Sequence, residues 1–183
     1  MKMRKINIKD ATRISVFAAL MVVCAWIWIP GPVPFTMQAF GIFLAAALMG
    51  ERHACVATVV YILLGAAGVP VFSGARGGIG VLLGPTGGFI LGFLPMAYIC
   101  GKICGKTKRS PQTLILSMLA GLLGCYITGT LWYALLYLGE NGKFALGTAI
   151  MQCVVPFIIP DLLKIFLAAF ISSRLLKHTN LFN

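Results

Sequence analysis

Long apolar runs, broken by short polar or proline- and glycine-rich segments, make up most of the 183-residue chain. A helix that spans the hydrocarbon core of a bilayer needs about 20 predominantly apolar residues. The runs predict six such helices, in one domain and with short loops, at about residues 14–29, 38–49, 54–68, 89–101, 112–138 and 144–173. The predicted fold class is therefore all-α, a polytopic membrane protein with six transmembrane helices.

Prolines and glycines mark where the predicted helices end. Three prolines between residues 30 and 34 end the first run, because proline lacks the N–H that a helix interior needs. The segment 70–88 is too rich in glycine and proline for a straight helix, so it predicts a re-entrant or irregular loop. The last run is interrupted at Pro156 and Pro160.

The composition agrees with a bilayer environment. Sixty per cent of the residues are hydrophobic and only 10% are charged, whereas a typical soluble domain is about 25% charged. Too few polar side chains are present to cover a water-exposed surface, which excludes a water-soluble globule. The same composition excludes a disordered chain.

The distribution of positive charge predicts the topology. Lysine and arginine outnumber aspartate and glutamate by 15 to 4. Arg76 and Lys143 fall on one side of the predicted helices, and Lys164 lies inside an apolar run. The other twelve fall on the opposite side: Lys2, Arg4, Lys5, Lys9, Arg13, Arg52, Lys102, Lys106, Lys108, Arg109, Arg174 and Lys177. Because cytoplasmic loops carry the excess of lysine and arginine, we expect both termini to be cytoplasmic. Cations placed in this way indicate topology and not a nucleic-acid partner.

The sequence lacks the familiar catalytic and metal-binding motifs. Segment 101–107 resembles a phosphate-binding P-loop, but three residues instead of four separate its first glycine from Gly-Lys-Thr. The six cysteines form no C-x-x-C pair and lie in or beside apolar runs. We therefore expect no catalytic residue, no metal and no cofactor, and we do not expect an enzyme.

Two charged residues lie inside an apolar run. Asp161 is followed one helical turn later, on the same face, by Lys164. On insertion scales, a charged residue at the centre of a membrane helix raises the free energy of insertion by about 2.5–3.5 kcal/mol. The prolines before Asp161 place it in the first turn of a restarted helix, where the helix dipole favours a negative charge. Broken helices beside charged residues are typical of substrate sites in transporters; a pair that only satisfies itself is the alternative.

The two predicted outer loops supply further candidates for ligand contacts. The first loop carries Phe35, Thr36 and Gln38 behind its prolines. The second carries Phe72, Ser73, Arg76 and Thr86 among glycines. Glycine allows the backbone to approach a ligand closely, although a purely structural re-entrant loop is the alternative.

Four segments together resemble the BioY family: residues 33–38 (VPFTMQ), 65–72 (GAAGVPVF), 77–88 (GGIGVLLGPTGG) and 159–164 (IPDLLK). BioY proteins are biotin-binding S components of energy-coupling factor (ECF) transporters, and the resemblance covers the whole chain. It implies a high-affinity biotin-binding subunit of an ATP-driven vitamin importer in a prokaryotic cell membrane, which captures biotin on the extracellular side. It also implies a transmembrane coupling protein and two cytoplasmic ATPases as partners, so that only the partner subunits use ATP.

The resemblance further implies roles in the biotin site for Asp161, Lys164, Thr36, Gln38, Phe72, Gly84, Pro85 and Thr86, with Arg76 a weaker match to the family pattern. Asp161 suits the N–H groups of the ureido ring as an acceptor, and either Lys164 or Arg76 suits the valerate carboxylate. Phe35 or Phe72 suits the apolar part of biotin as a wall.

Two other functional classes remain open on the sequence. The first is a self-sufficient, proton-coupled secondary transporter of biotin or a related small carboxylate, because an aspartate such as Asp161 can be protonated in an apolar site. The second is a small membrane enzyme, which is disfavoured because one acid and one lysine form no nucleophile–base set.

A ridge of small side chains marks the first predicted helix. Ala11, Ser15 and Ala19 recur at four-residue spacing and so share one face. Small residues allow a second helix to approach closely in a membrane. The ridge resembles the motif by which S components contact their coupling protein, so it predicts a partner interface; packing inside the protein's own bundle is the alternative.

Overall fold

The computed structural model describes residues 7–31, 33–107, 110–137 and 146–178. Several tail and loop cations (Lys2, Arg4, Lys5, Lys108, Arg109 and Lys143), Pro32 and residues 144–145 of the predicted last span lie outside the described residues. The elements are α1 (Ile8–Trp26), β1 (Trp28–Ile29), β2 (Phe35–Thr36), α2 (Gln38–Ala66), α3 (Ile79–Leu83), α4 (Gly87–Lys106), α5 (Pro111–Leu136), α7 (Leu146–Cys153), the 3₁₀ helix η1 (Val155–Phe157) and α8 (Ile158–His178). The prediction of a mainly helical fold is confirmed.

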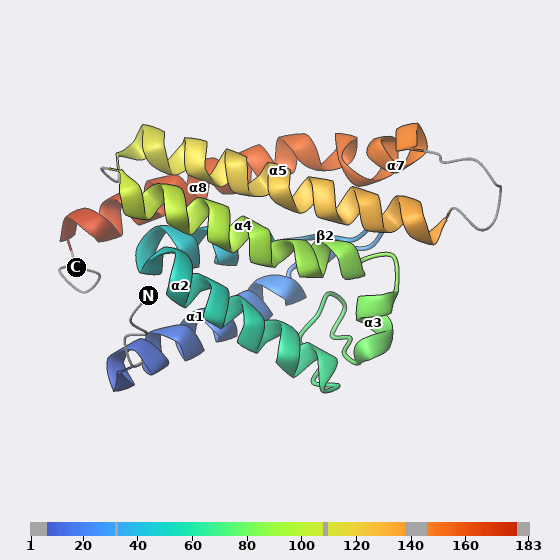
Figure 1. The fold of residues 1–183 in the computed structure, drawn as a ribbon, viewed down its shortest axis with the longest axis horizontal. Coiled ribbons are helices and arrows are strands. Elements are labelled where there is room, and N and C mark those ends of the chain that lie inside the picture. The colour runs from blue at the N-terminus through green and yellow to red at the C-terminus, as the bar shows by residue number, and fades with distance from the viewer. Residues whose placement is uncertain (1–6, 32, 108–109, 138–145, 179–183) are drawn as a thin grey trace.

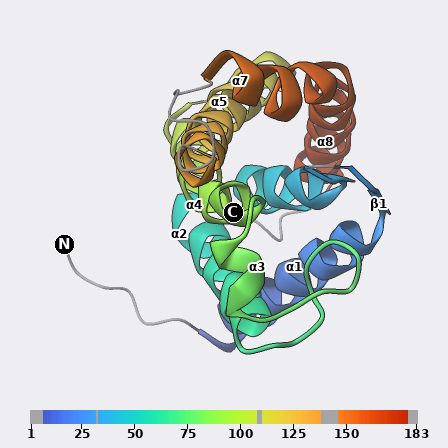
Figure 2. The same ribbon diagram turned by 90° about the vertical axis from the view of Figure 1, so that its right-hand side faces the viewer.

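The helices form an elongated bundle, in which α4 packs between α2 and α5 (Figure 1). The start of α1 and the end of α8 lie at one end of the molecule, hereafter the terminal end. The opposite end carries α3 and α7 and is hereafter the loop end. Figure 2 views the molecule from the loop end, where α5, α7 and α8 form an arc over α2 and α4.

The first helix begins earlier than predicted. Asn7 caps α1: its side chain accepts from the backbone of the first turn, and Asp10 reaches back to the Asn7 N–H at 3.3 Å. This reciprocal capping box satisfies two backbone donors that have no partner within the helix. The charged segment up to Arg13, predicted as a tail, is therefore helical from Ile8.

The second element, α2, is a pair of helices that folds back on itself at Gly50. Gly50 has a φ of 75° and a ψ of 178°, a conformation that glycine adopts without strain. The Gln38 side-chain amide donates to the hydroxyl of Tyr61, 23 residues further along the chain. In a straight helix these residues would lie about 35 Å apart. The two halves are therefore antiparallel neighbours and correspond to the predicted spans 38–49 and 54–68.

Four of the described helical segments are long and apolar enough to cross a membrane by length and composition: Gln38–Ala66, Gly87–Lys106, Pro111–Leu136 and Gly147–Lys177. The predicted number of six is not confirmed by this criterion. Two features explain the difference. Neither half of the 29-residue α2 reaches the usual length of about 20 residues, and the 19-residue α1 carries Lys9, Asp10 and Arg13 in its first turns.

The predicted break in the last run is confirmed. The chain leaves the helix after Cys153, passes through η1 and restarts as α8. Pro156 lies in η1, and Pro160 lies in the first turn of α8, where a missing N–H costs nothing because it would have no helical partner. Asp161 lies in the first turn of α8, as predicted.

The two predicted outer loops are irregular, and strand pairing or side-chain hydrogen bonds fix their positions. In the first, β1 and β2 pair antiparallel, with Trp28 opposite Thr36. In the second, the Trp26 indole donates to the Pro70 carbonyl at 3.1 Å, and the Trp132 indole on α5 donates to the Gly84 carbonyl at 3.0 Å. Both tryptophans thus fix a glycine-rich loop that has little secondary structure of its own.

Candidate functional site

A buried charge cluster lies where α8 begins. The Lys164 ammonium donates to Asp161 Oδ1 at 2.6 Å, and the two residues are only 4% and 5% exposed. The hydroxyl of Tyr126, on α5, donates to the other oxygen, Oδ2, also at 2.6 Å. The Lys164 Nζ also lies 4.0 Å from the centre of the Phe35 ring, a favourable cation–π distance. Every charged atom of the pair therefore has a partner.

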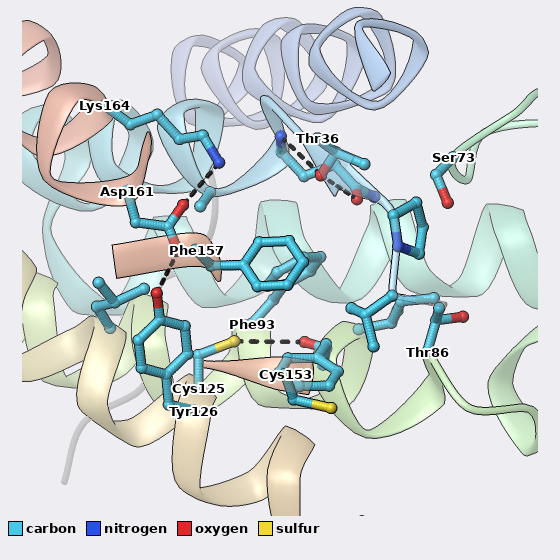
Figure 3. Close-up of a pocket in the computed structure, with 17 residues that line it drawn as sticks. Thr36, Ser73, Thr86, Phe93, Cys125, Tyr126, Cys153, Phe157, Asp161 and Lys164 are labelled. Atoms are coloured by element: carbon cyan, nitrogen blue, oxygen red, sulfur yellow. Dashed lines mark hydrogen bonds and ion pairs between the residues drawn. The ribbon is translucent and has the colours of Figure 1, made fainter. Parts of the chain in front are cut away.

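This cluster faces a cavity, hereafter the inner cavity, enclosed by α2, α4, α5, α7, α8 and the two loops. Its empty volume is about 610 Å³, with its open mouth included. Figure 3 shows Asp161 and Lys164 at one end and Ser73 and Thr86 at the other. The wall is mostly apolar; Phe89, Phe93, Leu122 and Phe157 contribute to it. An apolar wall with a few convergent polar groups is the usual character of a small-molecule site.

Two more polar side chains, Thr36 from the first loop and Gln38 from the start of α2, line the inner cavity. The Thr36 hydroxyl donates to the Gln38 side-chain carbonyl at 2.8 Å. The Gln38 amide donates to the Tyr61 hydroxyl, which in turn donates to the Val71 carbonyl at 3.1 Å. This chain of hydrogen bonds fixes Thr36 and Gln38 on the cavity wall and joins the first loop to the start of the second.

A separate cavity, hereafter the vestibule, lies between the two outer loops. It is lined by Gly31, Pro34, Arg76, Gly80, Val81, Gly84, Pro85 and Thr86. Pro34 and Thr86 also line the inner cavity, so the two cavities adjoin at these residues. Among the described residues, Arg76 is the one charged residue of the vestibule lining, and its Nε donates to the Ser73 carbonyl at 3.1 Å.

The structure brings most of the sequence-predicted residues together. Asp161, Lys164, Thr36, Gln38 and Thr86 line the inner cavity, and Arg76, Gly84 and Pro85 line the vestibule with Thr86. Two predicted aromatic residues lie elsewhere. Phe35 packs against the Lys164 ammonium, and Phe72 is fully buried in the core, edge-to-face on Tyr61 with a centroid distance of 5.6 Å. Neither lines the inner cavity or the vestibule.

Sequence reasoning missed Tyr126 and the aromatic wall. Tyr126 lies in the middle of the apolar run of α5, far from either predicted membrane surface. A tyrosine in such an apolar run needs a partner for its hydroxyl, so its position in the sequence could have indicated a polar contact inside the bundle. The wall residues Phe89, Phe93 and Phe157 carry no such signal, because phenylalanine is common in any apolar helix.

The predicted ridge on α1 lies on the outside of the molecule. Ala11, Ser15 and Ala19 are all exposed, and the Ser15 hydroxyl donates to the Ala11 carbonyl at 3.0 Å. The opposite side of α1 is buried through Ile14, Phe17, Ala18 and Met21. Helix α1 therefore presents this ridge outward, beside the exposed side chains of Val16 and Val23, and packs against the bundle with its opposite face.

Comparisons with known proteins give a consistent result. The sequence profile of the BioY family matches residues 1–180. The "Biotin transporter BioY" of Thermotoga maritima is 41% identical over 170 residues, which cover 92% of this chain and 96% of the relative. The "Probable biotin transporter BioY" of Pyrococcus horikoshii is 39% identical, with 93% and 98% covered. The crystal structure of "the S-component for biotin from an ECF-type ABC transporter" matches with a TM-score of 0.83 at 24% identity, over 98% of this chain and 96% of that one.

Proposed function

This chain belongs to the BioY family, and we propose that it is the biotin-binding subunit of an ATP-driven vitamin importer. In this proposal the loop end faces outward and captures biotin in the inner cavity. A transmembrane coupling protein and two cytoplasmic ATPases supply the energy. The observation that carries the proposal is the buried Tyr126–Asp161–Lys164 cluster at the end of a mostly apolar cavity.

The cluster suits the ureido ring of biotin. The ring presents N–H donors beside a carbonyl acceptor, and the cluster presents the complementary pair, the Asp161 carboxylate beside the Lys164 ammonium. Charge-assisted hydrogen bonds of this kind are shorter and stronger than neutral ones. The sulfur-containing ring and the valerate chain are apolar and would lie against Phe89, Phe93 and Phe157.

Removal of the Asp161 charge tests the assignment. In Asp161→Asn the side chain keeps its shape, but Lys164 loses its counter-ion. Because loss of one partner of a buried charged pair typically costs about 2–5 kcal/mol in binding, we expect biotin affinity to fall by about thirtyfold or more. Calorimetric titration of the purified subunit measures this. The control is Asp10→Asn, which removes an acidic charge at the terminal end and should bind like the parent.

Two outcomes would contradict the proposal. If Asp161→Asn binds biotin as tightly as the parent, the cluster is a structural ion pair. If the parent itself does not bind biotin, the substrate assignment is wrong. Biotin uptake by cells that express this chain without a coupling protein would instead support the self-sufficient secondary transporter.

A further inference from the structure

The outer face of α4 carries a tyrosine and a lysine that contact each other at the protein surface. The Lys102 ammonium donates to the Tyr98 hydroxyl at 2.8 Å and lies 4.8 Å from the centre of the tyrosine ring. Lys102 forms no salt bridge within the described part of the chain. Because the Tyr98 hydroxyl is the acceptor of this bond, its own O–H can still donate to a ligand. The pair therefore offers an anion a positive charge and a neighbouring hydroxyl donor.

The same face of α4 is apolar towards the loop end. Leu94 and Leu91 precede Tyr98 by about one and two helical turns, so they lie on the same side of the helix. Leu91 is 40% exposed and Tyr98 is 46% exposed. Towards the terminal end, Gly105 leaves open space, because nothing lies within 4 Å of the position of a Cβ atom, and Lys106 adds a second cation. Along α4 the face thus changes from apolar to cationic, which matches the two ends of an amphiphile.

A second helix has a cation beside an aromatic ring at the same distance from its end. Lys102 lies four residues before Lys106, the last residue of α4, and Arg174 lies four residues before His178, the last residue of α8. The Arg174 guanidinium carbon is 5.3 Å from the centre of the Phe170 ring. Both helices end at the terminal end (Figure 1). Aromatic rings are enriched at the membrane surface, and long cationic side chains extend from the apolar region to the headgroups. The two pairs therefore mark the level of the headgroups at the terminal end.

The charge of the terminal end is complementary to an anionic lipid. Among the described residues, this end carries two acids, Asp10 and Glu51. It also carries seven lysines and arginines: Lys9, Arg13, Arg52, Lys102, Lys106, Arg174 and Lys177. Basic segments beside a membrane are attracted to anionic lipids. The charge therefore favours a lipid with a negative headgroup over a neutral one.

We propose that the outer face of α4 binds an anionic phospholipid of the leaflet at the terminal end. The lipid phosphate meets the Lys102 ammonium and the Tyr98 hydroxyl, and one acyl chain lies along Leu94 and Leu91. This inference goes beyond the proposed function and does not depend on which substrate the inner cavity binds. It gives a partner to the exposed face of α4, whose other faces pack against α2 and α5.

Native mass spectrometry of the purified protein, titrated with phosphatidylglycerol or with diacylglycerol of the same acyl chains, tests the site. The two probes differ only in the phosphoglycerol headgroup. The parent should bind phosphatidylglycerol at least tenfold more tightly, about the effect of one hydrogen bond to a charged group. Lys102→Gln should lower the affinity for phosphatidylglycerol by about tenfold and leave that for diacylglycerol unchanged. Tyr98→Phe keeps the ring and should also lower only the affinity for phosphatidylglycerol.

Two further variants serve as controls. Lys177→Gln removes one exposed lysine at the same end of the molecule, on α8, and should keep the parental preference. Lys102→Arg keeps the charge and should also keep the preference, which separates loss of the contact from loss of the fold. If Lys177→Gln weakens phosphatidylglycerol as much as Lys102→Gln does, the lipid responds to overall charge and the site on α4 is wrong. Equal affinity of the parent for the two probes would also overturn the proposal.

Discussion

At the scale of single residues, Tyr126 connects the apolar interior to the charge cluster. Its hydroxyl donates to Asp161 Oδ2 at 2.6 Å, while Lys164 donates to Oδ1. A carboxylate oxygen has two lone-pair positions, so each oxygen can still accept from a ligand. Tyr126 therefore orients the Asp161 carboxylate without blocking it, and in the proposed function it would act through Asp161 as a positioning residue.

Tyr126→Phe removes the hydroxyl and keeps the ring. We expect biotin affinity to fall by about tenfold or more, because a hydrogen bond to a charged group contributes about 1.5–3 kcal/mol. The same substitution in an Asp161→Asn background should have a smaller effect, since the residue that it positions has lost its charge; a double-mutant cycle measures this coupling. Tyr98→Phe is the control, because the Tyr98 hydroxyl accepts from Lys102 on the exposed side of α4. Equal losses in both backgrounds would show that Tyr126 does not act through Asp161.

At the scale of elements, α4 packs closely against the turn of α2 at the terminal end. Gly101 on α4 lies against this turn: a Cβ atom at Gly101 would lie 2.4 Å from the backbone nitrogen of Glu51. The neighbour is backbone, which cannot rotate away. One helical turn later, Gly105 has nothing within 4 Å of the same position.

The two glycines give a matched pair of substitutions. Gly101→Ala should destabilise the protein by about 1–3 kcal/mol, the usual cost of overpacking, and should lower its melting temperature in detergent. Gly105→Ala should leave the melting temperature unchanged or raise it, because alanine is favoured over glycine within helices by about 0.5–1 kcal/mol. If both variants melted like the parent, the packing of α4 against Gly50 and Glu51 would not limit stability.

The same elements show that local features could be predicted from the sequence and long-range contacts could not. The break before Asp161 and the Asp161–Lys164 pair were predictable, because prolines act on their own helix and the pair is separated by a single turn. A break between the spans 38–49 and 54–68 was predicted, but the position of the reversal at Gly50 depends on one backbone conformation. The contact of Tyr126 with Asp161 joins residues 35 positions apart, and no local pattern encodes it. Phe72, one of two phenylalanines offered by the sequence as an apolar wall, packs into the core against Tyr61.

At the scale of the whole molecule, the inner cavity and the ridge on α1 lie on different parts of the structure. None of the residues that line the inner cavity in the described chain belongs to α1. The ridge residues Ala11, Ser15 and Ala19 are exposed, and the start of α1 lies at the terminal end (Figure 1). If the terminal end is cytoplasmic, as the charge distribution predicts, this ridge lies on the side where the proposed ATPase-bearing partner would bind. Binding and uptake should then be separable by mutation.

Ser15→Leu or Ala19→Leu should abolish biotin uptake by the full transporter and leave biotin binding to the isolated subunit unchanged. Leucine is favourable in a bilayer, so both variants should insert normally, but its larger side chain would prevent a second helix from approaching the ridge closely. Leu116→Phe is the control, since it adds bulk at an exposed position of α5, a different helix. Co-purification with the coupling protein, measured beside a biotin titration, decides the result. Loss of biotin binding would show that the ridge supports the subunit's own fold, and an intact complex would show that the partner docks on another face.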